Sequence, residues 1–374
     1  MAKRQNNEGT WGVKTIKGYK YHFYRNSDKK YFYGKTVKEV QEKVDNYNNS
    51  SSQLLVNNKT TVYEYSKYWL TTKENLIKSK TYDGYEYIIE YIIADTSQFD
   101  IKNKQIQNVT EKQLQSYFDG LIYKHAKSTI IKTKAIFNQI FNLAKKEKIV
   151  SYNIVSDIKI PIEDKIAKKT KTISFLNDED IVKLEKEAEN KLYSCNARMI
   201  VFILHTGLRI SELIGLEWED VDFDNRVIHI KNNKVLIKNR NKNDDNKYNF
   251  YNTTPKTNSG MRSIPLSDKA YEIILEMKGR HNKYVFVTSN GNTIYPANLT
   301  RTLNKMLKRA NCSIQKCGLH ALRHSFGSTL IRNGVDIKVV SKLLGHSKIS
   351  TTYDIYIHIL EESKKEAINI FNRS

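Results

Sequence analysis

Residues in the second half of the sequence have the types that can exchange one phosphate ester for another. They are Arg209, Lys256, His320, Arg323, His346 and Tyr356. A tyrosine hydroxyl can attack phosphorus and keep the bond energy as a covalent ester. Paired guanidinium groups suit the extra negative charge that develops on the phosphate oxygens in the transition state. We therefore treat these residues as a candidate site for phosphoryl transfer.

Each side chain fits one step of such a reaction. Tyr356 is the candidate nucleophile, and the two arginines would clamp the phosphate. Because free tyrosine has a pKa of about 10, a base must take its proton. We assign that role to His320, with His346 as a hydrogen-bond donor to the phosphate and Lys256 as the acid that protonates the leaving oxygen. With cations around the phosphate, we expect no cofactor and no metal ion.

The overall composition predicts a polyanionic partner. The chain has 374 residues, and its 62 lysines and arginines exceed 40 acidic residues, for a net charge of +22. Nucleic acid is the usual partner of so basic a protein, although a Lys-rich surface that binds nothing would give the same balance. No apolar run reaches the ~18 residues of a membrane span, and three cysteines argue against a disulfide framework. We expect a cytoplasmic protein with no membrane partner.

Two smaller parts precede the segment that carries the candidate site. Residues 10–34 alternate like three short strands, and Thr36 and Glu39 form a capping-box pattern for a following helix. Strands rich in lysine, arginine and tyrosine can enter a DNA major groove. A small module with an aromatic core explains the pattern equally well. Over residues 61–150, apolar residues at spacings of three and four predict a four-helix bundle.

The last part, from residue 173, must position the candidate site. Asn177 can cap its first helix, and a strongly apolar helix ends at Gly207, so that Arg209 falls in the first turn of the next helix. Further expected elements are strands at 227–230 and 262–266, a long hairpin at 231–254, a final amphipathic helix at 361–371, and linkers at 48–60 and 151–171. The chain is thus expected to be mainly α with small β elements.

Five short segments resemble, in their order and spacing, the motifs of the tyrosine recombinases, or phage-type integrases. The segments are residues 206–213, 255–257, 320–323, 343–346 and 352–358. The resemblance covers residues 173–374 and extends more weakly to 61–160. The first fifty residues resemble the arm-binding module of integrases from conjugative transposons and phages of Gram-positive bacteria.

This resemblance implies three domains. They are an arm-type DNA-binding β-β-β-α module at 1–50, a helical core-binding (SAM-like) domain at 61–160, and a mixed α/β catalytic domain at 173–374 whose C-terminal helix docks on a neighbouring protomer. Glu212 matches a family position that supports the active-site geometry. Two features depart from the family pattern: Ala321 stands where an acidic residue is common, and the hairpin at 231–254 is longer than in minimal members.

The resemblance also implies a reaction and its partners. Tyr356 would form a 3′-phosphotyrosine, and strands would exchange through a Holliday junction inside a homotetramer on double-stranded DNA attachment sites. The outcome would be integration and excision of a mobile element. A directionality factor or a host DNA-bending protein would be an additional partner.

Some assignments have competitors within the sequence. Tyr353 lies close to Tyr356. We favour Tyr356 because it is ten residues after His346 and two before His358, as in the terminal motif of the family that the sequence resembles. Lys256 competes with other lysines of the hairpin and is favoured by its place beside a proline ahead of a strand. The competing lysines are Lys234, Lys238, Lys242 and Lys247.

Other kinds of function remain open. His320 and His324 are spaced as on a metal-binding helix, but no glutamate follows His320, so the H-E-x-x-H pattern is missing and we interpret His324 as structural. A type IB topoisomerase-like enzyme would share the chemistry, act as a monomer and need no paired sites. A DNA-binding regulator could keep the fold without the activity, but the full set of catalytic residue types argues against it.

Overall fold

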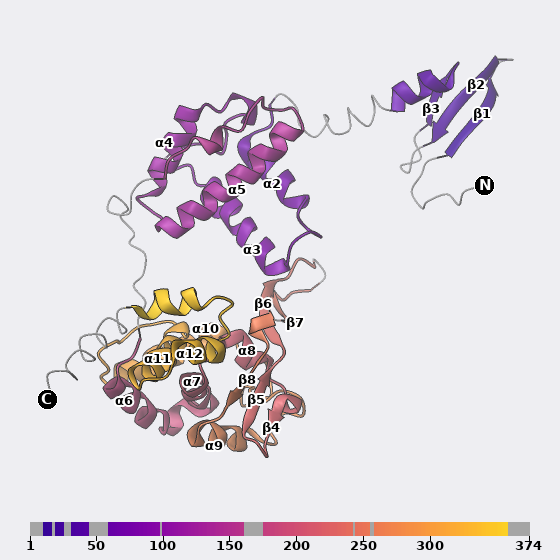
Figure 1. Ribbon diagram of the computed structural model, residues 1–374. Coiled ribbons are helices and arrows are strands. Elements are labelled where there is room, and N and C mark those ends of the chain that lie inside the picture. Colours follow the sequence, from indigo (N-terminus) through magenta and orange to yellow (C-terminus); the bar gives the residue numbers. More distant parts are fainter. Residues whose placement is uncertain are drawn as a thin grey trace. The chain divides into compact units, whose positions relative to one another are not determined.

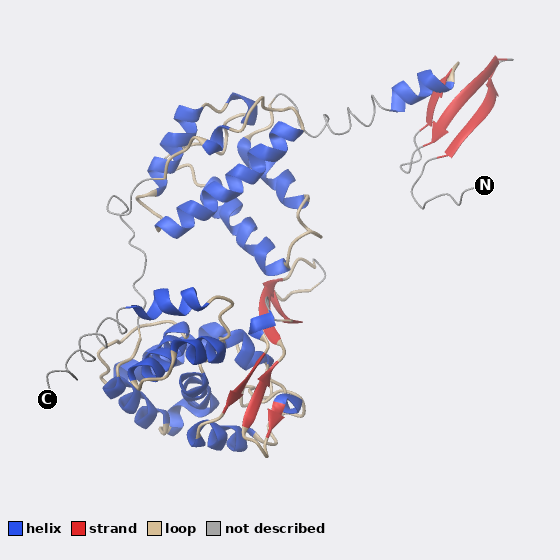
Figure 2. Ribbon diagram, in the orientation of Figure 1, coloured by secondary structure: helices blue, strands red, loops and turns tan. Residues whose placement is uncertain are grey.

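The computed structural model divides the chain into two compact units, Met1–Thr170 and Lys171–Ser374 (Figures 1 and 2). The residues described are 10–16, 19–25, 31–44, 59–97, 99–160, 175–241, 244–254 and 258–357. The predicted final helix at 361–371 and most of the predicted linker at 48–60 lie outside this part of the chain. Within it, no helix is long and apolar enough to cross a membrane.

The N-terminal module has the predicted β-β-β-α order. Its antiparallel sheet runs in the order β1-β2-β3, with β1 Thr10–Ile16, β2 Tyr19–Arg25 and β3 Tyr31–Gly34. A helix over residues 37–44 follows, and the Glu39 N–H donates to Thr36 Oγ1 at 3.2 Å, as the capping pattern predicts. Phe32, Val40 and Val44 form a small buried core between sheet and helix.

The helical part of the first unit contains the four predicted helices. They are α2 Val62–Thr71, α3 Ser79–Ile88 (continued by a π-helical turn, Ile89–Ile93), α4 Glu111–Leu121 and α5 Lys127–Lys146. Trp69, Phe118 and Phe137 lie fully buried in its core. The buried face of α5 passes through Ile130 and Phe137, whereas the neighbouring Ile131 is 48% exposed.

The second unit is built around the apolar helix α7, Ser194–Thr206 (Figure 1). The helices that contact α7 include α6 Asp178–Ala188, α8 Ile210–Gly215, α9 Asp268–Met277, α10 Pro296–Arg309 and α11 His320–Arg332. Its Met199, Ile200 and Phe202 are fully buried, so the apolar stretch 199–204 lies at the centre of a helical shell. Asn177 caps α6, as predicted, by accepting from the Asp180 N–H at 2.7 Å.

Two small sheets lie at one side of this helical core (Figure 2). One has the order β4-β5-β8 and the other is the predicted hairpin β6-β7. The strands are β4 Val221–Asp222, β5 Val227–Ile230, β6 Asn233–Lys238, β7 Tyr248–Thr253 and β8 Arg262–Pro265. Strand β6 packs on α8, Ile210–Gly215. This contact is close, since a Cβ at Gly215 would lie 2.9 Å from the Lys234 backbone nitrogen.

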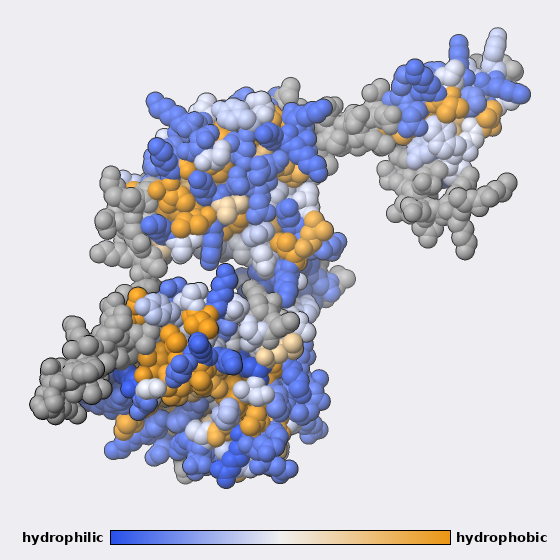
Figure 3. Space-filling model, viewed as in Figure 1, coloured by the Kyte–Doolittle hydropathy of each residue, from blue (hydrophilic) through white to orange (hydrophobic). Residues whose placement is uncertain are grey.

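The chain ends, as far as it is described, in two helices that follow α11. Helix α12 is Ile337–Leu344, and another helix begins at residue 349 and is described to 357. Gly207 and Gly345 end α7 and α12 in the left-handed conformation, with φ of 65° and 64°. Figure 3 shows hydrophilic side chains over much of the visible surface, with apolar patches between them.

Candidate active site

The turn between α7 and α8 positions Arg209. Arg209 is the N-cap of α8 rather than a residue of its first turn. Its backbone N–H donates to Glu212 Oε2 at 2.8 Å, and its Nη1 donates to Glu212 Oε1 at 2.7 Å. Its Nη2 donates to the Gly345 carbonyl at 3.2 Å. The side chain is 36% exposed, so its guanidinium is held by protein groups and still reachable from solvent.

Helix α11 carries Arg323 on a face that is buried by its neighbours. Arg323 Nη1 donates to the Gly207 carbonyl at 2.7 Å, and Nη2 donates to the Leu344 carbonyl. Burial lowers the pKa of Arg323 to about 9, and the nearby charge of Arg209 adds to the effect. The guanidinium therefore stays charged at neutral pH.

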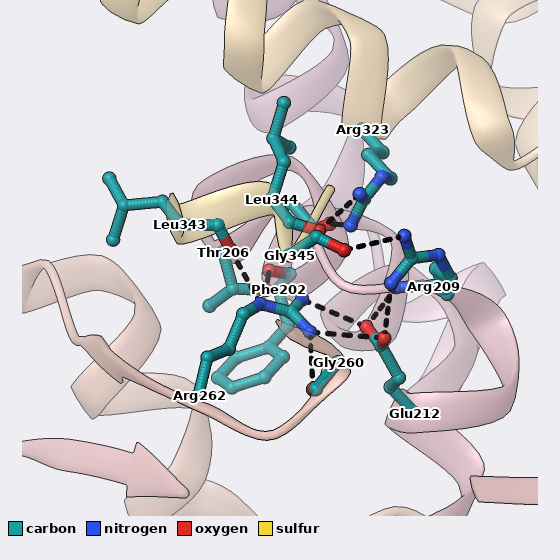
Figure 4. Close-up of polar contacts among 11 residues, drawn as sticks. Phe202, Thr206, Arg209, Glu212, Gly260, Arg262, Arg323, Leu343, Leu344 and Gly345 are labelled. Carbon is teal, nitrogen blue, oxygen red and sulfur yellow. Dashed lines mark hydrogen bonds and ion pairs between the residues drawn. The ribbon is translucent and has the colours of Figure 1, made fainter. Parts of the chain in front are cut away.

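The C-terminal end of α12 is where the arginines meet (Figure 4). The successive carbonyls of Leu343, Leu344 and Gly345 accept hydrogen bonds from Arg262, Arg323 and Arg209, respectively. The last carbonyls of a helix have no partner within the helix, and they form the negative end of its dipole. The end of α12 therefore gathers positive charge that an anion could then bind.

Arg262 is a member of this group that the sequence did not single out. Its Nη1 and Nη2 donate to the two carboxylate oxygens of Glu212 at 3.1 and 2.9 Å, and its Nε donates to the Leu343 carbonyl at 2.6 Å. Strand periodicity is the signal that could have found it. Arg262 lies two residues before Ile264, so both point inward on the same face of β8, and an inward arginine needs a partner.

Glu212 links two of these arginines while remaining buried. Burial by itself would raise the pKa of its carboxyl group, but the hydrogen bonds and charge of Arg262, together with the charge of Arg209, lower it overall. The carboxylate is therefore ionised and holds both guanidinium groups in place. This geometry agrees with the supporting role that the resemblance implies for Glu212.

The candidate histidines are both in an environment that favours the neutral imidazole. His346 directly follows the end of α12, and its Nδ1 lies 2.8 Å from Thr352 Oγ1. Burial, followed by the charges of Arg323 and Arg209, lowers the pKa of His346 to about 4. Burial, followed by the charges of Arg323 and Arg209, also lowers the pKa of His320. A neutral His320 has one ring nitrogen that can accept a proton, as a base requires.

Tyr356 lies buried on the helix that starts at residue 349, with 1% of its surface exposed. Its ring packs in a small apolar cluster with Ile331, Val340 and Leu344. Its hydroxyl lies against α11, since a Cβ at Gly327 would be 2.2 Å from Oη. Within the described residues, Oη has no hydrogen-bond partner. Burial raises the pKa of Tyr356 to about 12, and the Arg323 charge opposes this shift.

His324, rather than His320, lies beside this tyrosine. The ring centroids of His320 and His324 are 4.5 Å apart, and those of His324 and Tyr356 are 6.3 Å apart. Among the described residues, Nδ1 of His324 has no hydrogen-bond partner, although the atom is buried. The i, i+4 spacing of His320 and His324 places both rings on one face of α11, and the structural interpretation of His324 stays a prediction.

The structure brings five of the predicted residues together around the ends of α11 and α12. They are Arg209, His320, Arg323, His346 and Tyr356. Tyr353, the competing tyrosine, is 41% exposed. Lys256 lies outside the described residues, in the connection between β7 and β8. The roles assigned to these side chains stay predictions.

Comparison with known proteins identifies the family. The phage integrase family matches residues 174–363, and the phage integrase N-terminal SAM-like domain matches residues 61–122. A tyrosine recombinase XerC-like protein of Caldanaerobacter subterraneus subsp. tengcongensis is 30% identical over 365 residues, which cover 92% of this chain and 91% of the relative. The chain therefore belongs to the phage integrase family and is a tyrosine-type site-specific recombinase.

Other similar proteins come from mobile elements. A prophage ps2 probable integrase of Lactococcus lactis is 25% identical over 361 residues, covering 90% of this chain and 87% of the relative. The Tn1549 transposon integrase in complex with a circular intermediate DNA has a TM-score of 0.65 at 23% identity, over 79% of this chain and 95% of that one. A lambda integrase tetramer bound to a Holliday junction has a TM-score of 0.56 at 15% identity, over 94% of this chain and 96% of that one. These structural likenesses confirm the predicted fold class.

Proposed function

We propose that the protein cuts and rejoins double-stranded DNA through a 3′-phosphotyrosine at Tyr356 and a Holliday junction, and so integrates and excises a mobile element. The observation that carries the proposal is the meeting of Arg209, Arg323 and His346 at the end of α12, next to the helix that carries Tyr356. Related proteins described as prophage integrase and transposon transposase support the mobile-element role.

In the proposed reaction, the scissile phosphate lies between Arg209 and Arg323. The Tyr356 oxygen attacks phosphorus while His320 takes the phenol proton, and the P–O bond to the 5′ oxygen breaks. Lys256 gives a proton to that oxygen, which leaves as a 5′ hydroxyl. The hydroxyl of a partner strand then attacks the phosphotyrosine and releases Tyr356. Two such exchanges, in a homotetramer on paired sites, complete recombination.

The buried position of Tyr356 sets a condition on this reaction. Its hydroxyl lies against Gly327, and burial raises the pKa of the phenol to about 12. The ring must therefore leave this buried position before it can reach a phosphate held by the arginines. The helix that begins at residue 349 would have to shift when DNA binds.

A nicked suicide substrate tests the proposal. The substrate is a duplex with the sequence that borders the gene in its genome, nicked so that the released strand diffuses away. We expect a protein–DNA adduct that survives high salt and forms in the presence of EDTA. Tyr356→Phe should bind the same duplex and form no adduct, because it lacks only the attacking oxygen. The matched control is Tyr353→Phe, which should react like the unchanged protein.

Two outcomes would contradict the mechanism: adducts that persist in Tyr356→Phe, or adducts that disappear only on chelation. Relaxation of supercoiled DNA that carries no site would instead favour a type IB topoisomerase-like enzyme.

A further inference from the structure

Arg262 lies at the junction of three chain segments of the proposed site. Its guanidinium donates to both carboxylate oxygens of Glu212 on α8, to the Leu343 carbonyl at the end of α12, and to the Gly260 carbonyl ahead of β8. Those segments carry Arg209, His346 and the connection from Lys256, respectively. A single side chain thus connects α8, the end of α12 and the chain just ahead of β8 (Figure 4).

The same contacts leave Arg262 little capacity to bind substrate. A guanidinium has five N–H donors, and four hydrogen bonds to protein acceptors occupy this one. Its side chain is 6% exposed, compared with 36% for Arg209. Arg323 is also buried, with 1% exposed, but its guanidinium makes two described hydrogen bonds to protein carbonyls and so keeps donors for a phosphate. Arg209 and Arg262 share the Glu212 carboxylate, but only Arg209 is open to a phosphate.

We infer that Arg262 is a positioning residue for strand cleavage, which acts by holding Glu212, and through it Arg209, against the end of α12. The inference rests on the proposed function. Its side-chain geometry is specific: a planar fork meets both oxygens of one carboxylate, and a third donor reaches a carbonyl on another helix. A lysine ammonium carries the same charge but cannot make this planar set of contacts.

Glycine at position 345 shows how closely the fork is packed. A Cβ on Gly345 would lie 3.0 Å from both Cδ and Nη1 of Arg262, and 2.9 Å from the Ser259 carbonyl oxygen. The aliphatic part and the guanidinium of Arg262 are therefore both packed against Gly345, whose carbonyl accepts a hydrogen bond from Arg209. A small displacement of the Arg262 guanidinium would therefore also move the Gly345 carbonyl that accepts a hydrogen bond from Arg209.

Single-turnover cleavage of the nicked duplex by Arg262→Lys tests the inference. We expect an unchanged Kd for the duplex and a cleavage rate about 100-fold lower, the size of effect known for small misplacements of reacting groups. The matched control is Arg226→Lys. Arg226 also binds a carboxylate, Asp268, but on the exposed surface, so its rate should not change.

The combination with Arg209→Ala separates positioning from general support of the fold. If Arg262 acts through Arg209, adding Arg262→Lys to Arg209→Ala should slow cleavage by less than about threefold, because interacting groups are non-additive. Two results would overturn the inference. In one, the fold-reduction in cleavage rate of the double variant equals the product of the reductions of the two single variants. In the other, Arg262→Lys cleaves at the unchanged rate. Absence of any adduct with the unchanged protein would instead overturn the proposed function.

A second variant covers the case in which Arg262→Lys does not fold. Arg262→Met combined with Glu212→Leu removes both members of the buried ion pair, a change that folded proteins often tolerate, and leaves only the partly exposed Arg209 without its carboxylate. We expect a folded protein that cleaves about 100-fold more slowly, since Arg209 has then lost its carboxylate. Cleavage by this variant at the unchanged rate would overturn the inference.

Discussion

Gly327 determines where the hydroxyl of Tyr356 lies, because it has no side chain. A Cβ there would be 2.2 Å from Oη, closer than nonbonded atoms approach. Glycine inside a helix is less favourable than alanine by about 0.5–1 kcal/mol. Close packing of Tyr356 on α11 is a physical reason for a glycine at this position.

Gly327→Ala should therefore displace the Tyr356 ring, and the clash should cancel the stability that alanine brings to α11. The matched control is Gly84→Ala in α3, where a Cβ would meet no atom within 4 Å. The control should raise the local stability of α3 by about 0.5–1 kcal/mol. Native-state hydrogen exchange of the two helices measures both effects. A comparable gain in α11 would contradict the packing described for Tyr356.

Residue types and motif order were enough to predict the side chains that the structure gathers around α12. Arg209, Arg323 and His346 are far apart in the chain, but each stands in a distinctive short motif. Arg262 was missed because its contacts depend on tertiary structure: a strand arginine has no partner until β8 meets α8 and α12. The position of His324 beside Tyr356 likewise depends on how two helices pack.

At the scale of elements, α12 and its terminal glycine hold the site together. Gly345 has a φ of 64° and supplies a carbonyl to Arg209, while the two carbonyls before it bind Arg262 and Arg323. A left-handed conformation costs a residue with a Cβ about 1–2 kcal/mol. At Gly345 the crowding by Ser259 and Arg262 adds to that cost.

Gly345→Ala should consequently destabilise the second unit by more than a left-handed alanine alone. The matched control is Gly291→Ala, where φ is 74° and a Cβ would meet no atom within 4 Å. The control isolates the conformational cost of about 1–2 kcal/mol. Thermal unfolding should show a lower Tm for Gly345→Ala than for Gly291→Ala. Equal values would mean that the end of α12 can move to make room.

Most of the helices could be predicted because their apolar spacing and caps are local signals. Gly207 ends α7 because glycine readily adopts the left-handed conformation. Asn177 starts α6 because its side chain accepts a hydrogen bond from the Asp180 N–H. Boundaries were less certain, as Arg209 shows: it caps α8 instead of entering its first turn, because Glu212 binds its backbone N–H. On α5, adjacent isoleucines could not be told apart by spacing alone, and the packing of the bundle buries Ile130 and exposes Ile131.

At the scale of the whole molecule, a net charge of +22 favours contact with the phosphates of DNA. The lysines and arginines are spread through the chain, so contacts to phosphates should be numerous. Each contact releases a condensed cation from DNA, which makes affinity fall as salt rises. The proposed domains at 1–50, 61–160 and 173–374 would share these contacts.

Binding to duplex DNA without an attachment site should therefore weaken about 1,000-fold or more between 50 and 200 mM salt. Fluorescence anisotropy of a labelled duplex measures the affinity at each salt concentration. Tyr356→Phe is the control, and it should show the same slope because the phenol carries no charge at neutral pH. An affinity that hardly changes with salt would mean that the basic surface does not contact phosphates.

The acceptors at the end of α12 belong to the backbone, and this has a consequence for how the sequence can change over time. Every residue type keeps its backbone carbonyl, so replacing Leu343 or Leu344 need not remove an acceptor from Arg262 or Arg323. Packing still restricts position 344, because Leu344 is fully buried. The left-handed conformation of Gly345 restricts the sequence more strictly. Related sequences could therefore differ in the surrounding side chains and still keep the same backbone carbonyls as acceptors for the three arginines.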